Sequence, residues 1–135
     1  MKLNRSVKVQ VPQKRGEMNL QDIITNLKLD VLTDPKQFEI VEPSSVYAAD
    51  LLSCVMAGAE HRSVWITLQS HSNIVAVGSL LELSAIIITE GAQPDQETID
   101  KANEEGIAML STNQPSFYVS GKLWEMGLRP KTLSA

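Results

Sequence analysis

Residues 64–90 constrain the fold of this chain more than any other stretch. They read VWITLQSHSNIVAVGSLLELSAIIITE, which indicates a strand, a polar turn, an almost wholly apolar helix and a second strand. A helix that is apolar on nearly every side must be covered on every side. Two strands joined by such a helix form a βαβ unit, whose strands pair in parallel through a right-handed crossover.

The flanking sequence continues this alternation of short apolar runs and longer amphipathic ones. The order predicts an α/β fold, a three-layer α/β/α single domain around a largely parallel sheet, with a mixed sheet as the alternative. The expected strands are residues 29–32, 38–41, 45–48, 64–68, 85–89 and 107–110, and the expected helices are residues 18–27, 51–59, 73–83, 94–105 and 113–126.

Local signals place the helix ends. We expect Asn19 and Asp50 to be N-caps, and either Ser72 or Asn73 to cap the apolar helix. Pro94 suits a first helical position. Glycine ends two of the helices, because it adopts the left-handed conformation easily, and we expect Gly106 and Gly127 to do so.

Composition narrows the class of protein. A chain of 135 residues is expected to form one domain, and no apolar run reaches the ~18 residues that span a bilayer. The first residues lack the apolar stretch of a signal peptide. Cys54 is the only cysteine, so no disulfide framework is expected. These features predict a cytoplasmic protein without a membrane partner.

Charge is distributed unevenly along the chain. The first 15 residues carry five basic side chains and no acid, and the remaining 120 carry seven basic and 16 acidic ones, a net charge of −9. We interpret residues 1–17 as a basic arm or tail, and residues 18–135 as the α/β domain. The acidic body argues against nucleic acid as a partner. Two alternatives for the arm are an anionic partner, or an edge strand that Val7, Val9 and Val11 add to a neighbour and that Pro12 ends.

Polar residues gather where the strands end. In a parallel sheet every strand-to-helix turn lies at the carboxyl edge, where ligands bind and helix N-termini attract anions. Four turns meet this description, at residues 49–50, 69–73, 89–91 and 111–114. The candidate ligand-binding residues are Asp50, Gln69, Ser70, His71, Asn73, Thr89, Glu90 and Thr112. They suit a phosphate, a carboxylate or a nucleotide; the alternative is that they only cap helices and form turns.

Motifs for catalysis are missing from the sequence. It has no GxxxxGK[ST], GxGxxG, GxSxG or HExxH pattern and no zinc-ligand spacing, so we predict no enzyme activity, metal or cofactor. His71 is the sharpest single candidate, because the histidine side chain can donate a hydrogen bond to a phosphate or act as an acid or base. A general acid/base pair of Asp50 and His71, in a small hydrolase or transferase, is a remote alternative.

The apolar helix also suggests an oligomer. One side of residues 74–83 packs on the sheet, and the other needs either a neighbouring helix or a second copy of the chain. We therefore hypothesise a homodimer with two-fold symmetry.

These patterns together resemble the DRTGG-domain family, similar in fold to the N-terminal domain of HPr kinase/phosphorylase. The resemblance rests on residues 50–56 (DLLSCVM), 64–71 (VWITLQSH), 73–90 and 94–107, and covers about residues 20–128. The sequence contains no Asp-Arg-Thr-Gly-Gly, and residues 43–50 stand where members carry related turns. The family implies a dimeric regulatory module, alone or beside nucleotide-sensing CBS domains. The serine kinase label given to stand-alone copies is not expected here, because the kinase's P-loop lies in a separate domain.

The leading hypothesis is therefore a stand-alone, non-catalytic regulatory or sensor domain in signalling. It binds a small anionic effector, with a nucleotide as one candidate, or signals to a regulated partner protein through the four turns. The alternative is a protein-interaction or dimerisation module without a ligand.

Overall fold

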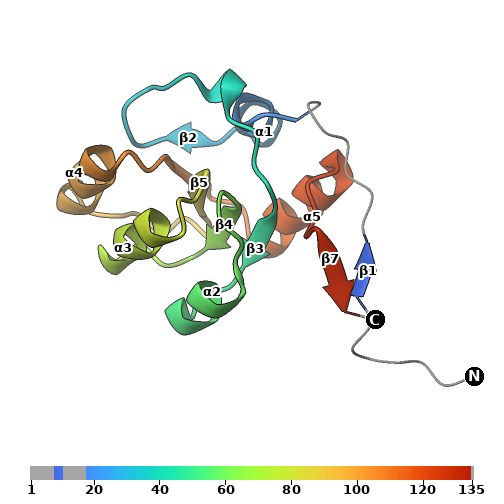
Figure 1. The fold of residues 1–135 in the computed structure, drawn as a ribbon. Coiled ribbons are helices and arrows are strands. Elements are labelled where there is room, and N and C mark those ends of the chain that lie inside the picture. Colours follow the sequence, from blue (N-terminus) through green and yellow to red (C-terminus); the bar gives the residue numbers. More distant parts are fainter. Residues whose placement is uncertain (1–7, 11–17, 135) are drawn as a thin grey trace, which may run out of the picture.

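The computed structural model describes residues 8–10 and 18–134 (Figure 1). Its centre is a five-stranded sheet in the order β2-β6-β5-β4-β3. The strands are β2 (Asp30–Val31), β3 (Val46–Ala48), β4 (Val64–Thr67), β5 (Ala85–Ile88) and β6 (Met109–Ser111). The helices are α1 (Leu20–Leu27), α2 (Leu52–Gly58), α3 (Asn73–Leu80), α4 (Gln96–Glu105) and α5 (Ser116–Met126), with a 3-10 turn, η1 (Phe38–Ile40).

The sheet is largely parallel but mixed, which agrees with the mixed-sheet alternative of the prediction. Strands β3 to β6 run parallel, and the short β2 pairs antiparallel with β6 at one edge. The predicted βαβ unit is present: β4 and β5 pair from Val64 with Ala85 to Thr67 with Ile88, and every residue of both strands is buried. Such double burial explains why both strands lack charge.

Helices cover both faces of the sheet, which confirms the three-layer prediction. One core lies between the sheet and α2, α3 and α4, and contains Trp65, Ile86 and Met109. The other lies between the sheet and α1, η1 and α5, and contains Ile66, Ile87 and Leu110. Alternate residues of one strand therefore enter opposite cores.

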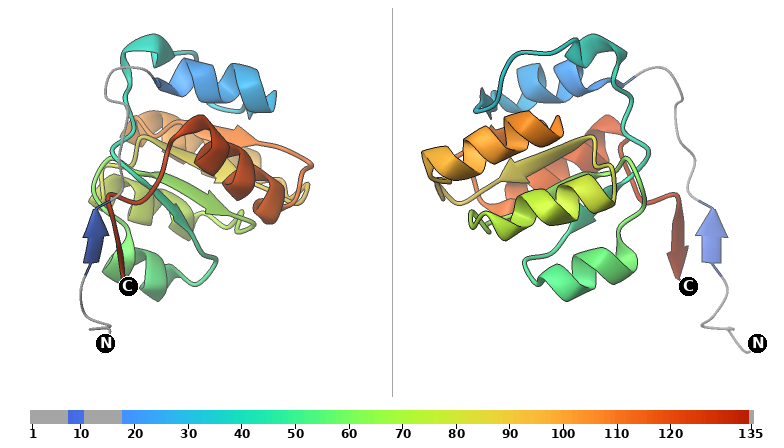
Figure 2. Two further views of the ribbon diagram at one scale, coloured as in Figure 1. Left: turned by 90° about the vertical axis from the view of Figure 1, so that its right-hand side faces the viewer. Right: turned by 60° about the vertical axis from the view of Figure 1, so that its left-hand side comes forward.

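Helix α3 has neighbours on both sides. Figure 2 shows it between α2 and α4, and both helices contact it. Ile74, Val75 and Val77 are buried, and Leu80 is the large side chain of α3 that remains exposed. The neighbouring-helix alternative therefore accounts for the apolar sequence, and α3 does not by itself require a second copy of the chain.

Several predicted helix ends are confirmed. Asn19 caps α1 in a capping box, in which its side chain accepts a hydrogen bond from the Asp22 amide and the Asp22 carboxylate accepts one from the Asn19 amide. Gly106 and Gly127 end α4 and α5 with φ of 72° and 101°, in the left-handed region that glycine tolerates.

Three local predictions are wrong. The expected strand at residues 38–41 is η1, because Phe38 packs into the core as a single anchor and no strand pairs with it there. The apolar helix ends at Leu80, not at residue 83, because Glu82 takes a left-handed φ of 50°. Pro94 is not the first helical position: Asp95 is the N-cap of α4, and α4 begins at Gln96.

The two ends of the described chain lie together, away from the main sheet (Figure 1). Strand β1 (Lys8–Gln10) pairs antiparallel with β7 (Thr132–Ser134) of the same chain. The rest of the predicted basic arm, including Val7, Val11 and Pro12, lies outside the described residues. None of the helices in the described part of the chain is long and apolar enough to cross a membrane.

Candidate functional site

The carboxyl edge of the sheet brings the four polar turns side by side. The parallel strands β3, β4, β5 and β6 are neighbours in the sheet and end at a common register, with Ala48 beside Ile66 and Thr67 beside Ile88. The turns that follow them carry all eight candidate residues. What these residues do in the fold decides which of their polar groups remain for a ligand.

Asp50 ties the turn after β3 to the end of β4. Its Oδ1 accepts hydrogen bonds from the Thr67 hydroxyl and from the Leu68 amide, each at 2.9 Å. The prediction that Asp50 caps α2 is therefore wrong: Leu51 is the N-cap, and it makes no side-chain cap bond. A carboxylate that serves two donors of the next turn holds the two turns in fixed relation.

Gln69 strengthens the same connection. Its side-chain amide donates to the backbone oxygen of Asp50 at 3.1 Å, and its backbone amide donates to the Thr67 hydroxyl at 3.0 Å. Thr67 is fully buried and is not among the site residues predicted from the sequence, although a threonine in an otherwise apolar, buried strand is a polar group in need of a partner.

His71 caps the helix that follows it. Its Nδ1 accepts a hydrogen bond from the Asn73 amide at 3.2 Å, which in the neutral ring leaves the proton on Nε2. The side chains of His71 and Asn73 are exposed, and Ser70 is half-buried. Among the described residues no hydrogen bond joins His71 to Asp50, so the acid/base pair considered above is not formed.

The turn after β5 is fastened to the start of α5. The hydroxyl of Thr89, which is buried, lies 2.6 Å from that of Ser116, and the Glu90 carboxylate accepts from the Ser116 amide at 2.8 Å. Ser116 is not among the site residues predicted from the sequence, and its only local signal is its place directly after Pro115. Glu90 itself has a left-handed φ of 61°.

Thr112 also has a role within the fold. It is nearly buried, and its hydroxyl accepts a hydrogen bond from the Gln114 amide at 3.1 Å. Its backbone connects two turns, because its amide donates to Ile88 and its carbonyl accepts from Gly91.

Asp95 is a further acidic residue at this edge. Its carboxylate accepts from the hydroxyl and the amide of Thr98 at 2.7 and 2.9 Å. These two bonds lower the pKa of Asp95, and the charge of His71 lowers it slightly further. The signal was present in the sequence, since aspartate is a preferred N-cap, but the proline beside it favoured a different helix start.

At three of the four helices that begin at this edge, a side chain of the protein itself therefore bonds one N-terminal amide, whereas α2 has no side-chain cap. His71 takes an amide of α3, Asp95 takes one of α4, and Glu90 takes one of α5. Of the eight candidate residues, Gln69, Ser70, His71 and Asn73 are partly or wholly exposed and lie in one turn; Asp50 and Glu90 are also exposed, but their carboxylates are bonded to backbone amides. No group of three or more His, Cys, Asp or Glu residues in the described part of the chain could hold a metal ion.

Comparisons with known proteins agree with this fold. A solved structure with a similar fold, at TM-score 0.63 and 22% identity, contains the CBS and DRTGG domains of the regulatory region of Clostridium perfringens pyrophosphatase, complexed with the activator diadenosine tetraphosphate. The match covers 76% of this chain and 44% of that chain, so this chain spans less than half of that structure. A search of curated proteins gave no significant match. The specific likeness to the HPr kinase domain stays a prediction. Residues 22–126 match the DRTGG domain, and the protein belongs to this family.

Proposed function

We propose that this chain is a regulatory domain that binds a nucleotide effector at the carboxyl edge of its sheet. The observation that carries the proposal is the turn at residues 69–73, where four polar side chains remain accessible on a rigidly held backbone. Support also comes from the pyrophosphatase regulatory region, in which a DRTGG domain occurs in a structure with a bound dinucleotide activator.

The arrangement favours one part of a nucleotide over another. The Asp50 carboxylate is bonded to the Leu68 amide just before this turn, and Asp95 lies close enough to His71 for their charges to interact, so acidic groups beside the turn repel phosphate. His71 itself occupies one of the amides at the N-terminus of α3 that would attract an anion. Amide, hydroxyl and imidazole groups suit the base and the ribose hydroxyls instead. We therefore propose that the nucleoside part contacts Gln69, Ser70, His71 and Asn73, and that the phosphates extend toward solvent.

A ligand on this turn has a physical route to the rest of the edge. Gln69 is bonded to the Asp50 backbone, and Asp50 is bonded to Thr67 and Leu68. Thr89 also donates to the Thr67 carbonyl, and it contacts Ser116 of α5. A shift of one turn therefore changes the hydrogen bonds of its neighbours, which is what signalling to a partner protein requires.

A thermal-shift screen tests the proposal. The probes are mononucleotides, dinucleotides, dinucleotide polyphosphates, nucleosides and inorganic phosphate. A ligand at about 100 times its dissociation constant should raise the melting temperature by several degrees. We expect nucleosides and nucleotides to act and inorganic phosphate to have no effect.

Matched variants locate the site. Gln69→Ala and His71→Ala should remove the shift, whereas Gln37→Ala and His61→Ala change the same residue types in exposed turns elsewhere and should keep it. The proposal is wrong if no nucleotide shifts the melting temperature at millimolar concentration, or if the four variants behave alike.

A second candidate function, an interaction module, is favoured by α5. Phe117 is 89% exposed and Trp124 is 44% exposed, one helical repeat of seven residues apart. Gly121 lies between them with no atom near the place of a Cβ. This face is self-complementary, because an antiparallel copy would set Phe117 of one chain against Trp124 of the other with the helices close at Gly121.

Sedimentation at high micromolar concentration tests the second candidate. We expect a homodimer that Phe117→Ser converts to a monomer, and that Leu80→Ser on the exposed side of α3 leaves intact. A monomeric wild-type protein excludes this interface without affecting the effector site, which lies in a different turn.

A further inference from the structure

We propose a second binding site at the opposite, amino edge of the sheet, for a small organic monoanion with an apolar body. A cavity of about 250 Å³ opens there, the space of roughly eight water molecules. It is lined by the segments that lead into β4, β5 and β6, namely Arg62, residues 82–84, and Gly106 with Ala108. The effector site proposed above is at the other end of these strands.

The wall of the cavity is apolar and fixed. It is lined by Leu20, Phe38, Leu83 and Ala108, all of which are buried, together with the partly buried Val41. These residues come from α1, from η1 and its flank, and from the segments just before β5 and β6, so the wall belongs to the core and is formed before any ligand arrives. A preformed apolar wall gains free energy by covering the apolar part of a ligand.

Three charged side chains surround this wall. Lys36 and Arg62 are cationic and Glu82 is anionic, which leaves a net charge of +1 in a body that is otherwise acidic. The Lys36 amine donates to the Gly106 carbonyl at 2.6 Å and keeps two further protons for a ligand. Within the described chain, neither the Arg62 guanidinium nor the Glu82 carboxylate has a hydrogen-bond or ion-pair partner of its own.

The backbone at two of these residues is strained. Arg62 has φ of 63° and Glu82 has φ of 50°, in the left-handed region where a side chain raises the energy and glycine does not. Both positions thus carry long charged side chains where glycine would have a lower backbone conformational energy. Unfavourable conformations of this kind collect at functional sites.

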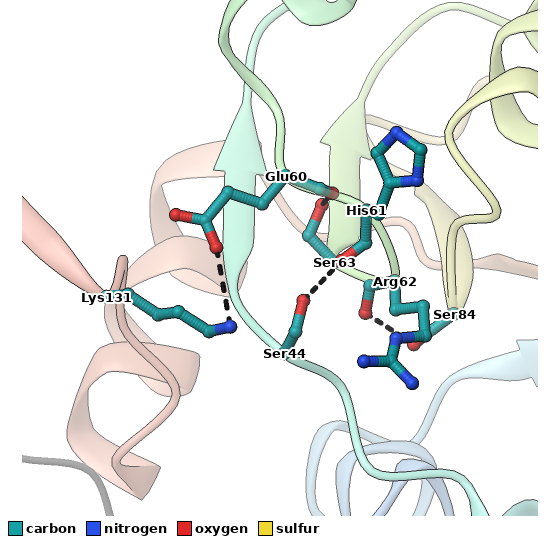
Figure 3. Close-up of polar contacts among 7 residues, drawn as sticks. All are labelled: Ser44, Glu60, His61, Arg62, Ser63, Ser84 and Lys131. Atoms are coloured by element: carbon teal, nitrogen blue, oxygen red, sulfur yellow. Dashed lines mark hydrogen bonds and ion pairs between the residues drawn. The ribbon is translucent and has the colours of Figure 1, made fainter.

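The turn that carries Arg62 is held firmly by other residues. Figure 3 shows the hydroxyls of Ser44, Ser63 and Ser84 donating to the backbone carbonyls of His61, Glu60 and Arg62. The Arg62 amide donates to Leu81, which joins this turn to the one that carries Glu82. The fold therefore uses the backbone of Arg62 and leaves its guanidinium available.

The chemistry indicates the class of ligand. A carboxylate matches the planar fork of a guanidinium, and a lysine amine adds a second donor. The single net positive charge favours a monoanion over a phosphate dianion, because Glu82 repels the second charge. An aliphatic or aromatic monocarboxylate places its chain on the apolar wall and its carboxylate on Arg62 and Lys36.

Titration of the ¹⁵N-labelled protein with hexanoate tests the site. We expect saturable chemical-shift changes at Arg62, Leu83, Ser84 and Ala108, with a dissociation constant on the order of 1 mM. Hexanamide has the same chain without the charge and should bind at least about tenfold more weakly. Inorganic phosphate should leave these amides unchanged.

Two glycine variants separate binding from folding. Arg62→Gly and Glu82→Gly relieve the same backbone strain, so both should retain or raise the melting temperature. Arg62→Gly should weaken hexanoate binding at least about tenfold, and Glu82→Gly should keep or tighten it. Lys101→Gln, on the exposed side of α4, should have no effect on binding. The proposal is overturned if hexanoate produces no saturable shifts up to about 10 mM, if hexanamide binds equally well, or if the two glycine variants lose binding equally.

Discussion

The carboxylate of Glu90 accepts a hydrogen bond from the backbone amide of Ser116, 26 residues away, at 2.8 Å. The turn after one strand thus supplies the N-terminal acceptor of the helix after the next strand. Pro115, the N-cap of α5, makes no side-chain cap bond of its own, so the cap comes from Glu90. This long-range cap is part of the reason why the carboxyl edge is rigid.

Removal of this cap should destabilise the protein. We expect Glu90→Ala to lower the free energy of unfolding by about 1 kcal/mol, the usual effect of losing an N-cap acceptor. Glu90→Gly loses the same acceptor but relieves the left-handed φ of 61°, so it should be closer to the wild type. Urea denaturation measures both, and an alanine variant as stable as the wild type would contradict the role of the cap.

Asp50 should stabilise the edge and not α2. Asp50→Ala leaves the buried Thr67 hydroxyl and the Leu68 amide without their acceptor, and should lower the free energy of unfolding by about 1–3 kcal/mol. Asp50→Asn keeps an oxygen acceptor and should lose less. In hydrogen exchange, the Leu68 amide should become less protected while Cys54 and Val55 do not, since both donate to Leu51. Faster exchange in α2 alone would instead support the capping role.

Asp95 should make stability depend on acid pH. Its hydrogen bonds to Thr98 hold the pKa of Asp95 in the folded state below its usual value. The stabilisation by Asp95 is therefore fully present above the pKa of the unfolded state, and it is lost as the pH falls through the pKa of the folded state. Melting temperatures between pH 7 and pH 3 should therefore fall more steeply for the wild type than for Asp95→Asn, whose amide caps the helix without titrating in this range. Parallel curves would show that Asp95 does not contribute to acid sensitivity.

Two helical glycines should respond oppositely to alanine. A Cβ at Gly78 would lie 3.2 Å from Ile86 Cδ1 and 3.4 Å from Ile107 Cγ2, so Gly78→Ala should push α3 away from the sheet and destabilise the protein. A Cβ at Gly121 would meet nothing within 4 Å, so Gly121→Ala should stabilise the monomeric protein by about 1 kcal/mol. Thermal denaturation at low concentration compares the two, and the same sign for both would refute the packing argument.

The sequence predicted the central fold because its signals there were local and mutually consistent. The apolar residues of β4 and β5, the amphipathic α1 with Asn19 at its start, and the glycines after α4 and α5 each point to one structure. Phe38 shows where prediction from local sequence fails, because a single buried aromatic residue looks the same in the sequence of a strand and in that of η1.

The carboxyl edge was predictable as a place but not as a set of contacts. Parallel pairing alone brings the four turns together, so their position follows from the strand order. The partners of Asp50 and Glu90 lie 17 to 26 residues away, and nothing near either residue in the sequence distinguishes such a bond from a local cap. Likewise the sequence does not predict the left-handed φ of Arg62 and Glu82, because neither residue is a glycine or an asparagine, the types that adopt this conformation readily.

The order of the strands has a consequence for how the chain folds. Because β3, β4, β5 and β6 are neighbours in the sheet in the same order as in the sequence, each new strand pairs with the one made just before it. Strand β2 is the exception, since it waits for β6, about 80 residues later in the chain. Loop closure over that distance is slow compared with pairing of adjacent units. We therefore expect the β4-α3-β5 unit to form early in folding and β2 to dock late.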